Sequence, residues 1–204
     1  MRYRPTHKQE IRQRILEVAA SQFRSNGSEA VRVADVMQAA GLTHGGFYKH
    51  FEDKDQLLRE AVSTALDQVA TRLRDMVRNL SRREALRKVI ATYLSEEHML
   101  RPDLGCALAA MGTELARMPL AMKSAVGEAL DAYADRLDFL MPGATASQRR
   151  SAFLVLFSSM AGCIMSARAH PNQETRIQML AAGRAFFEQA FCSEQPPAFL
   201  ETVN

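Results

Sequence analysis

Residues 45–51 read GGFYKHF, and this stretch decides how the rest of the chain is interpreted. Two adjacent glycines open a segment that has helical neighbours on both sides. Each glycine lowers helix stability by about 1 kcal/mol relative to alanine. A helix this short would avoid that cost unless a side chain at Gly45 or Gly46 kept another molecule away. Two aromatic and two basic residues follow at once. The stretch therefore predicts a short helix whose backbone closely approaches a partner.

Two helices precede this stretch. In the first, which stops at Asn26-Gly27, the apolar residues fall four apart: Ile11, Ile15, Ala19 and Phe23. The second spans about Val33 to Ala40 and ends at Gly41, since glycine adopts the left-handed conformation of a tight C-terminal turn. Thr43 then caps the third helix. This layout predicts a helix-turn-helix, whose last helix enters the major groove of DNA.

The side chains around the third helix fit contacts with DNA. The hydroxyls of Thr43 and Tyr48 can donate to phosphates, and the helix N-terminus also favours an anion. This leaves His44, Phe47 and Lys49 to face base edges or thymine methyl groups.

Some of these residues have an alternative role in the core. A lone aromatic such as Phe47 is often buried, and we place Phe51 in the core. His50 is either a partly buried hydrogen-bonding histidine or a base reader. His44 and His50 have no cysteine or carboxylate at ligand spacing, so no metal site is expected.

Residues 36–57, VMQAAGLTHGGFYKHFEDKDQL, resemble the DNA-binding signature of TetR/AcrR-type transcriptional repressors. The matching residues are Ala40, Gly41, Leu42, Thr43, Gly45, Tyr48, His50, Phe51, Lys54 and Leu57. The resemblance implies phosphate contacts from Thr43, Tyr48 and Lys54. It also implies that His44, Gly45, Phe47 and Lys49 sit at or near the base edges.

The chain departs from this family at Arg32, where a threonine commonly caps the second helix and touches phosphate. Arginine has no side-chain oxygen for capping, but it can reach a phosphate. The candidate DNA-binding residues are therefore Arg32, Thr43, His44, Gly45, Phe47, Tyr48, Lys49, His50 and Lys54.

The remainder of the chain also predicts helices, because no stretch alternates with a period of two. Asp53 caps a long fourth helix, and Ser81 begins a fifth that Arg101-Pro102-Asp103 breaks. Further helices are expected at about 105–118, 119–141, 145–170 and 172–191. The fold class is all-α, with about nine helices. We expect a DNA-binding domain at 1–52, an effector-binding and dimerisation domain at 53–192, and a tail at 193–204.

Composition narrows the setting of the protein. The 204 residues carry a formal net charge of +3, with basic residues clustered at Arg2, Arg4, Lys8, Arg12 and Arg14. Such a cluster attracts polyanions or solvates a helix face. Three cysteines without CxxC spacing indicate neither a disulfide framework nor a zinc site, which favours the cytoplasm. We expect neither a secretory signal at the N-terminus nor a segment that approaches the ~18 uncharged apolar residues of a membrane span.

The last two helices predict a dimer surface. The helix at about 145–170 has an apolar stripe of Phe153, Leu156, Phe157, Met160 and Ile164, with small residues beside it. The helix at 172–192 is apolar over much of its circumference, which indicates deep burial or a partner. We expect the two helices to form a four-helix interface between protomers.

The central helices predict an effector pocket. Its candidate residues are Cys106, Tyr93, Met111, Met122, Phe157 and Met160, because methionine suits an irregular apolar cavity. The effector would be a small apolar or electrophilic molecule. Cys106 stands in the first turn of a helix, where the dipole lowers a thiol pKa. It is either a thiol that senses electrophiles or oxidants or an inert buried thiol.

These features predict a transcriptional repressor that binds a palindromic operator as a homodimer and is released by an effector. Nucleotide-binding and hydrolase motifs are absent from the sequence, so neither an enzyme nor a cofactor is expected. The alternative is a helical adaptor that binds only protein. An adaptor would not need Gly45, Tyr48 and Lys54 at these offsets.

Overall fold

The computed structural model of the protein describes residues 7–193, 197, 199 and 200. Those residues form nine α-helices and three short 3-10 helices, without a strand. The prediction of an all-α fold with about nine helices is confirmed. Arg2 and Arg4 lie outside the described residues, as does most of the predicted tail.

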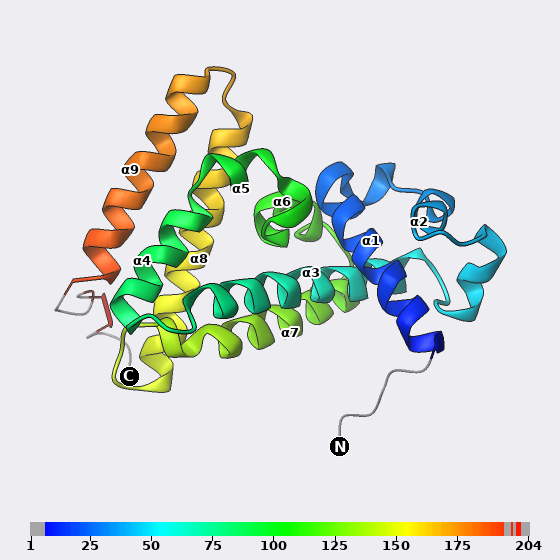
Figure 1. Ribbon diagram of the computed structural model, residues 1–204, viewed down its shortest axis with the longest axis horizontal. Coiled ribbons are helices and arrows are strands. Elements are labelled where there is room, and N and C mark those ends of the chain that lie inside the picture. The colour runs from blue at the N-terminus through cyan, green and yellow to red at the C-terminus, as the bar shows by residue number, and fades with distance from the viewer. Residues whose placement is uncertain (1–6, 194–196, 198, 201–204) are drawn as a thin grey trace.

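Three helical segments form the N-terminal end of the molecule (Figure 1). They are α1 (His7–Ala30), α2 (Val33–Ala39) and the 3-10 helix η1 (His44–Lys49). The predicted stop at Gly27 is a break inside α1, where this glycine has a φ of 77° and a ψ of 166°. Gly41 has a φ of 73°, the left-handed conformation that turns the chain from α2 toward η1.

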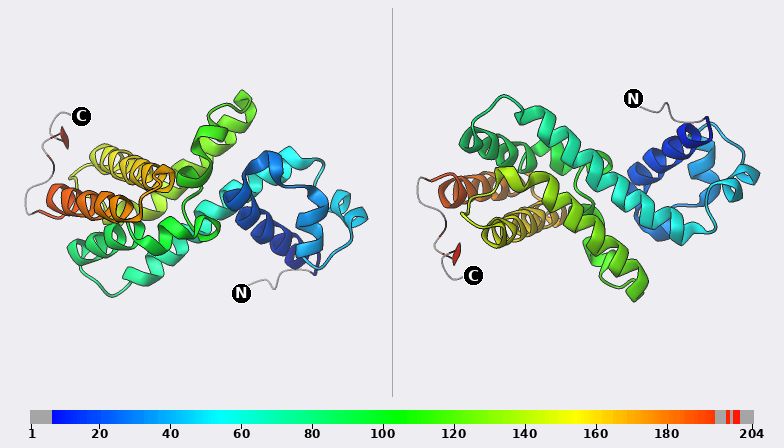
Figure 2. Two further views of the ribbon diagram at one scale, coloured as in Figure 1. Left: turned by 90° about the horizontal axis from the view of Figure 1, so that it is seen from above. Right: turned by 90° about the horizontal axis from the view of Figure 1, so that it is seen from below.

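A long helix, α3 (Lys54–Val77), leads from this end into the rest of the molecule. The Asp53 carboxylate accepts the backbone N–H of Gln56 at 2.7 Å, which confirms the predicted cap. One end of α3 packs against α1, and α3 runs beside α7 (Leu120–Leu137) (Figures 1 and 2). The same helix therefore borders the N-terminal helices and the larger helical body.

The predicted fifth helix is shorter than expected. It is α4 (Arg82–Tyr93), which Ser81 and Glu84 start with reciprocal capping hydrogen bonds. The helix ends before the predicted break because the Ser95 hydroxyl accepts the His98 N–H and so caps a new helix, α5 (Glu96–Leu100). The 3-10 helix η2 (Pro102–Leu104) occupies the predicted break, and α6 (Ala107–Leu115) is the helix that was predicted at 105–118, shorter at both ends.

The C-terminal helices lie at the end opposite α1 and α2 (Figure 2). The chain passes from α7 through the 3-10 helix η3 (Asp138–Leu140) into α8 (Ala146–Ala169) and α9 (Gln173–Phe191). Thr145 and Asn172 cap the last two helices through their side chains. Both helices fall within a residue or two of their predicted ranges and pack side by side.

By length and composition, α8 is long and apolar enough to cross a membrane, so the expectation that no segment comes close was wrong. A core helix of a soluble protein meets the same criteria. Here α8 contributes eight buried residues and packs against four other helices, α5, α6, α7 and α9.

Candidate nucleic-acid interface and internal cavity

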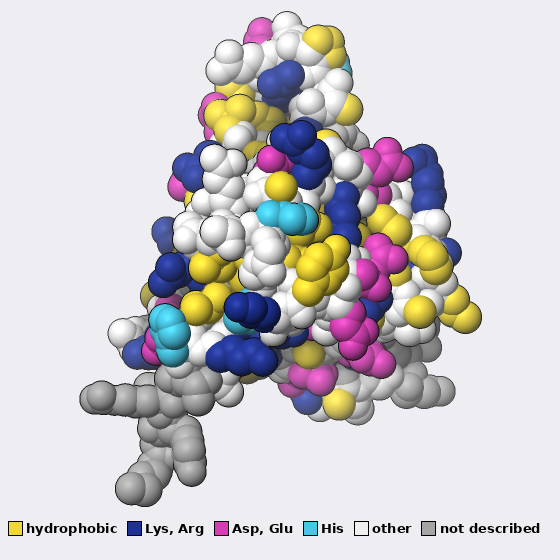
Figure 3. Space-filling model, turned by 90° about the vertical axis from the view of Figure 1, so that its right-hand side faces the viewer, with side chains coloured by type: hydrophobic (Ala, Val, Ile, Leu, Met, Phe, Trp, Pro, Cys, Tyr) yellow, Lys and Arg dark blue, Asp and Glu magenta, His cyan; other side chains and the backbone are white. Residues whose placement is uncertain are grey.

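The predicted recognition helix is η1, and its outer edge is open to solvent. Tyr48 is 70% exposed, and Thr43, His44, Gly45 and Lys49 are also exposed. Thr43 occupies the N-cap position of η1, but its side chain makes no capping hydrogen bond. Its hydroxyl is therefore available to an external acceptor. Figure 3 shows this end of the molecule, where lysine, arginine and histidine side chains lie among apolar ones.

Nothing inside the protein requires a glycine at position 45. A Cβ at Gly45 would meet no atom within 4 Å, and one at Gly46 would make an ordinary contact of 3.5 Å with Met37. Neither glycine has a positive φ. The helix propensity lost at Gly45 is thus not offset by any contact in the folded chain.

The expectation that Phe47 faces base edges is wrong. Phe47 is 1% exposed, and its ring stacks on Phe51 at 5.6 Å between centroids. Because the two residues are four apart and the Phe51 N–H donates to the Phe47 carbonyl at 3.1 Å, they share one face. Burying Phe51, as predicted, also buries Phe47. The Phe47 ring contacts Tyr48 edge-on at 5.3 Å and so supports this exposed side chain.

Sequence reasoning missed the residue that fixes η1 in place, Arg12 of α1. Its guanidinium pairs with Glu60 of α3, with an N–O distance of 2.6 Å, and lies 4.6 Å from the centre of the Phe51 ring. Its Nε also donates to the His50 carbonyl at 3.4 Å. One side chain thus connects α1, α3 and the end of η1. Its partners lie 38 and 48 positions away, so no local pattern could reveal it.

The remaining candidate DNA-binding residues are His50, Arg32 and Lys54. His50 is half-buried, and its Nδ1 is buried without a hydrogen-bond partner. Burial, followed by the charges of nearby basic residues, lowers the pKa of His50. Arg32 precedes α2 without capping it, and its guanidinium pairs with Asp35 at 2.8 and 2.9 Å on the exposed surface. Lys54 is the half-buried first residue of α3. None of these positions prevents contact with a phosphate.

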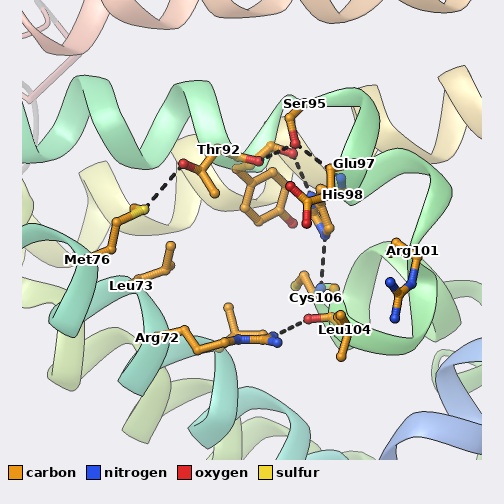
Figure 4. A pocket seen from close by; sticks show the side chains of 13 residues that line it. Arg72, Leu73, Met76, Thr92, Ser95, Glu97, His98, Arg101, Leu104 and Cys106 are labelled. Carbon is orange, nitrogen blue, oxygen red and sulfur yellow. Dashed lines mark hydrogen bonds between the residues drawn. The ribbon is translucent and has the colours of Figure 1, made fainter.

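A cavity of about 210 Å³ lies between α3, α4 and residues 95–106 (Figure 4). Its walls include Val69, Leu73 and Met76 of α3 and Tyr93 of α4. The chain from Ser95 to Cys106 closes the opposite side. These segments are distant in the sequence, and the folding of α3 against α4 brings them together.

Only two of the six predicted effector residues, Tyr93 and Cys106, line this cavity. The other four lie in the hydrophobic core instead: Met111, Met122, Phe157 and Met160. Their side chains are apolar and face neighbouring helices, which a helical spacing alone does not distinguish from a cavity wall. The Cys106 side chain is also enclosed, since the residue is only 2% exposed.

His98 organises the polar side of the cavity. Its Nδ1 lies 2.5 Å from the Tyr93 carbonyl, and its Nε2 accepts the Cys106 backbone N–H at 3.1 Å. Nδ1 must donate and Nε2 must accept, so the ring is neutral in this geometry. Burial, more than the charges of Arg168 and Arg72, lowers the pKa of His98. A Cβ at Gly105 would lie 2.5 Å from Nε2, so only glycine leaves room for this imidazole.

Two phenol hydroxyls next to the cavity lack partners. The hydroxyls of Tyr93 and Tyr133 are buried without a hydrogen bond, and both rings pack edge-on against Phe157. Burial raises the pKa of Tyr93 and of Tyr133 well above the ordinary tyrosine value. Leaving such a group unpaired costs about 1–3 kcal/mol. Tyr93 lines the cavity, whereas Tyr133 does not.

Arginines bind the cavity wall to its surroundings. Arg24 of α1 is 4% exposed and donates to the Gly105 carbonyl at 3.2 Å. Burial, together with nearby Arg72, lowers the pKa of Arg24 to about 10. Arg72 donates to the Leu104 carbonyl. Arg168 of α8 donates to the carbonyls of His98, Met99 and Ala109 at 2.8–2.9 Å.

A second bond joins the N-terminal helices to the larger body. Glu114 of α6 accepts the backbone N–H of Ser28 at 2.8 Å and also its hydroxyl. Together with the Arg24–Gly105 bond, it connects α1 to both sides of the segment 105–114. These two bonds therefore join α1 directly to the cavity wall and to α6.

The predicted dimer stripe on α8 lies inside the protomer. Its members are all buried in the core: Phe153, Leu156, Phe157, Met160 and Ile164. The stripe was wrong as an interface because these side chains pack on helices of their own chain. The opposite face of α8 is exposed and carries Leu154, Val155, Ser158, Ser159 and Gly162. On α9, Ile177 and Phe186 are exposed, and Phe186 reaches 64%.

Comparison with known proteins agrees with the N-terminal geometry. Residues 15–61 match the family described as "Bacterial regulatory proteins, tetR family". The chain is 36% identical over 63 residues to the HTH-type transcriptional repressor KstR2 of Mycobacterium tuberculosis H37Rv. That match covers 31% of this chain and 32% of KstR2, so it spans about a third of the relative's length.

Solved structures match over most of the chain. A TetR-family regulator from Cytophaga hutchinsonii has a TM-score of 0.70 at 21% identity, covering 92% of this chain and 98% of that one. The regulator FadR from Bacillus subtilis, in complex with stearoyl-CoA, has a TM-score of 0.62 at 18% identity, covering 86% and 95%. At these identities the likeness establishes a common fold. Residues 15–61 therefore match the N-terminal part of the tetR family of bacterial regulatory proteins, and the chain as a whole shares the fold of TetR-family regulators.

Proposed function

We propose that the chain is a transcriptional repressor that binds a palindromic operator as a homodimer and releases it when a small molecule occupies the cavity. The exposed edge of η1 carries this proposal. Gly45 has no reason inside the protein to be glycine, and the hydroxyls of Thr43 and Tyr48 stand beside it. These groups, with Lys49, would meet one half-site, and the cytoplasm would be the place of action. The family consists of regulators, which supports a protein without enzymatic activity.

The test is binding of a palindrome selected from random duplexes, followed by fluorescence anisotropy at two salt concentrations. Arg32, Lys49 and Lys54 offer three cations to each half-site. Six cations in a dimer predict an affinity loss of about a thousand-fold between ~50 and ~200 mM salt. A salt-insensitive complex, or no DNA complex at all, would favour the adaptor.

The homodimer would use the exposed faces of α8 and α9. Small residues on α8 permit close helix approach, and the exposed Phe186 supplies an apolar anchor. Phe186→Asp should shift the protein to monomer in analytical ultracentrifugation at micromolar concentration. A wild-type monomer under the same conditions would refute the interface.

Release would follow from the bonds that join the cavity wall to α1. An effector acts only through a difference in its affinity for the DNA-bound and released conformations. Two bonds would supply the connection. Arg24 of α1 donates to the Gly105 carbonyl at the cavity wall, and Glu114 of α6 accepts from Ser28 of α1. The FadR complex with stearoyl-CoA supports effector binding in this fold. A thiol-reactive effector would have to enter the cavity to reach Cys106.

A further inference from the structure

The cavity combines apolar walls with a few donors that lack an acceptor. Val69, Leu73 and Met76 form the apolar side. Engineered cavities of about 150 Å³ hold a benzene ring, so 210 Å³ admits such a ring with one small head group. The cavity thus fits a compact molecule with an apolar body and a polar end.

Tyr93 defines what the polar end must be. The residue is 3% exposed, lines the cavity, and has a buried hydroxyl without a hydrogen-bond partner. Its neighbour His98 cannot serve as its acceptor, because both imidazole nitrogens are engaged with backbone groups. The adjacent Cys106 offers only a sulfur atom, which is a weak acceptor. The missing group in the cavity is therefore an acceptor.

The charges around the cavity favour an anionic acceptor. Arg72 lies at the cavity and uses one guanidinium nitrogen on the Leu104 carbonyl, which leaves further N–H donors. Arg101 also lines the cavity but is held by Asp103 at 2.8 and 3.0 Å. The one acid in the lining, Glu97, is exposed. Tyr93 is influenced by the neighbouring Cys106 and Tyr133 and by the positive charge of Arg168, whereas His98 is influenced by the charges of Arg168 and Arg72; no carboxylate acts on Tyr93 or His98.

From this cavity, we infer that the protein binds a small monocarboxylate, with its apolar body against α3 and its carboxylate accepting from Tyr93 and Arg72. A carboxylate is an acceptor with two oxygens, which matches one phenol O–H and one guanidinium N–H. The inference deepens the proposed function, since this ligand would be the effector of the repressor.

The probe is benzoate, compared with the neutral benzyl alcohol of similar size, by calorimetry and thermal shift on the whole protein without DNA. Benzoate should bind at least about tenfold more tightly than benzyl alcohol, the factor that ~1.4 kcal/mol of charge-assisted bonding would give. Equal binding of both probes would contradict the inference, because a site for a carboxylate must prefer the charged ligand to the neutral one. No heat and no thermal shift up to about 10 mM benzoate, well above the ~1 mM range accessible to so small a ligand, would overturn the inference.

Two matched variants separate the hydroxyl of Tyr93 from general effects on packing. Tyr93→Phe should lower benzoate affinity at least about fivefold, since it removes one donor to a charged group. The ligand-free variant should melt no lower than wild type, because the lost hydroxyl has no partner. Tyr133→Phe makes the same change at an unpaired hydroxyl that does not line the cavity, so affinity should stay within about twofold. Equal losses in both variants would contradict the assignment.

The carboxylate site can be tested independently of the proposed repressor function. Calorimetry decides the carboxylate site without DNA. Addition of benzoate to the protein–operator complex then tests the role of the site. Binding without release would retain the site and remove its role as the effector site. Failure to bind any DNA would reject the repressor without affecting the calorimetric result.

Discussion

Replacing Gly45 with alanine should change stability and DNA affinity in opposite directions. The new Cβ meets nothing within 4 Å and the backbone has no positive φ, so the fold accommodates it. Alanine gains about 0.5–1 kcal/mol of helix propensity over glycine. For a protein of this size that gain raises the melting temperature by roughly 1–4 °C. On DNA, loss of one close contact in each half-site costs ~2–6 kcal/mol, or about thirty-fold or more in affinity.

The assay pairs thermal unfolding with anisotropy on the selected palindrome. Gly127→Ala is the matched control, because Gly127 lies within α7 and a Cβ there also meets nothing within 4 Å. It should raise stability by a similar amount and leave DNA affinity unchanged. If Gly45→Ala binds the palindrome as tightly as wild type, the glycine does not mark close approach to DNA and the orientation of η1 is wrong.

Three further predictions concern single side chains. Tyr48→Phe should weaken operator binding about tenfold or more through a lost phosphate bond, with the free energy of unfolding within ~0.5 kcal/mol of wild type by denaturant titration; unchanged affinity would exclude the phenol from the interface. Glu114→Ala should cost about 1–3 kcal/mol in the same titration. It should be non-additive with Ser28→Ala, because both substitutions remove the bond from the Ser28 hydroxyl to the Glu114 carboxylate; additive losses would argue against this bond. Since the pKa of His98 is lowered in the folded protein, the unfolded chain takes up this proton first as pH falls below ~6.5, and the free energy of unfolding declines there. His98→Asn should make the free energy of unfolding depend less on pH between pH 7 and 5, and an equally steep decline in this variant would assign the decline to other groups.

Local signals in the sequence were enough for the helices and their caps. Asp53 and Ser81 cap as predicted, because a cap depends on residues three positions apart. The early end of α4 was missed because Ser95 is one of several residues that can start a helix, and the tertiary position of His98 decides which one does. Periodicity identifies the apolar face of a helix, but it does not tell whether that face packs within the protomer or against a second protomer.

In the candidate sites, too, the sequence predicts the features that depend on a local motif and misses those that depend on tertiary packing. The exposed residues of η1 follow from a contiguous motif, whereas the burial of Phe47 depends on Phe51 packing inward from the same face. The cavity wall could not be predicted, because Val69 and Cys106 meet only through the crossing of α3 and the segment after α5. Methionine fills gaps in a packed core and also suits a cavity wall, so Met111 gave no signal of its own.

The bonds of α1 also limit how this protein can be recombined with its relatives. A chimera made from residues 1–52 and another regulator's body would strand the buried guanidinium of Arg24 without the Gly105 carbonyl, and Ser28 without Glu114. It would also remove Leu57 and Leu58, which are buried in the same core as α1. Operator preference is therefore better transferred by grafting the few exposed side chains of η1 onto an intact recipient than by exchanging the whole N-terminal module.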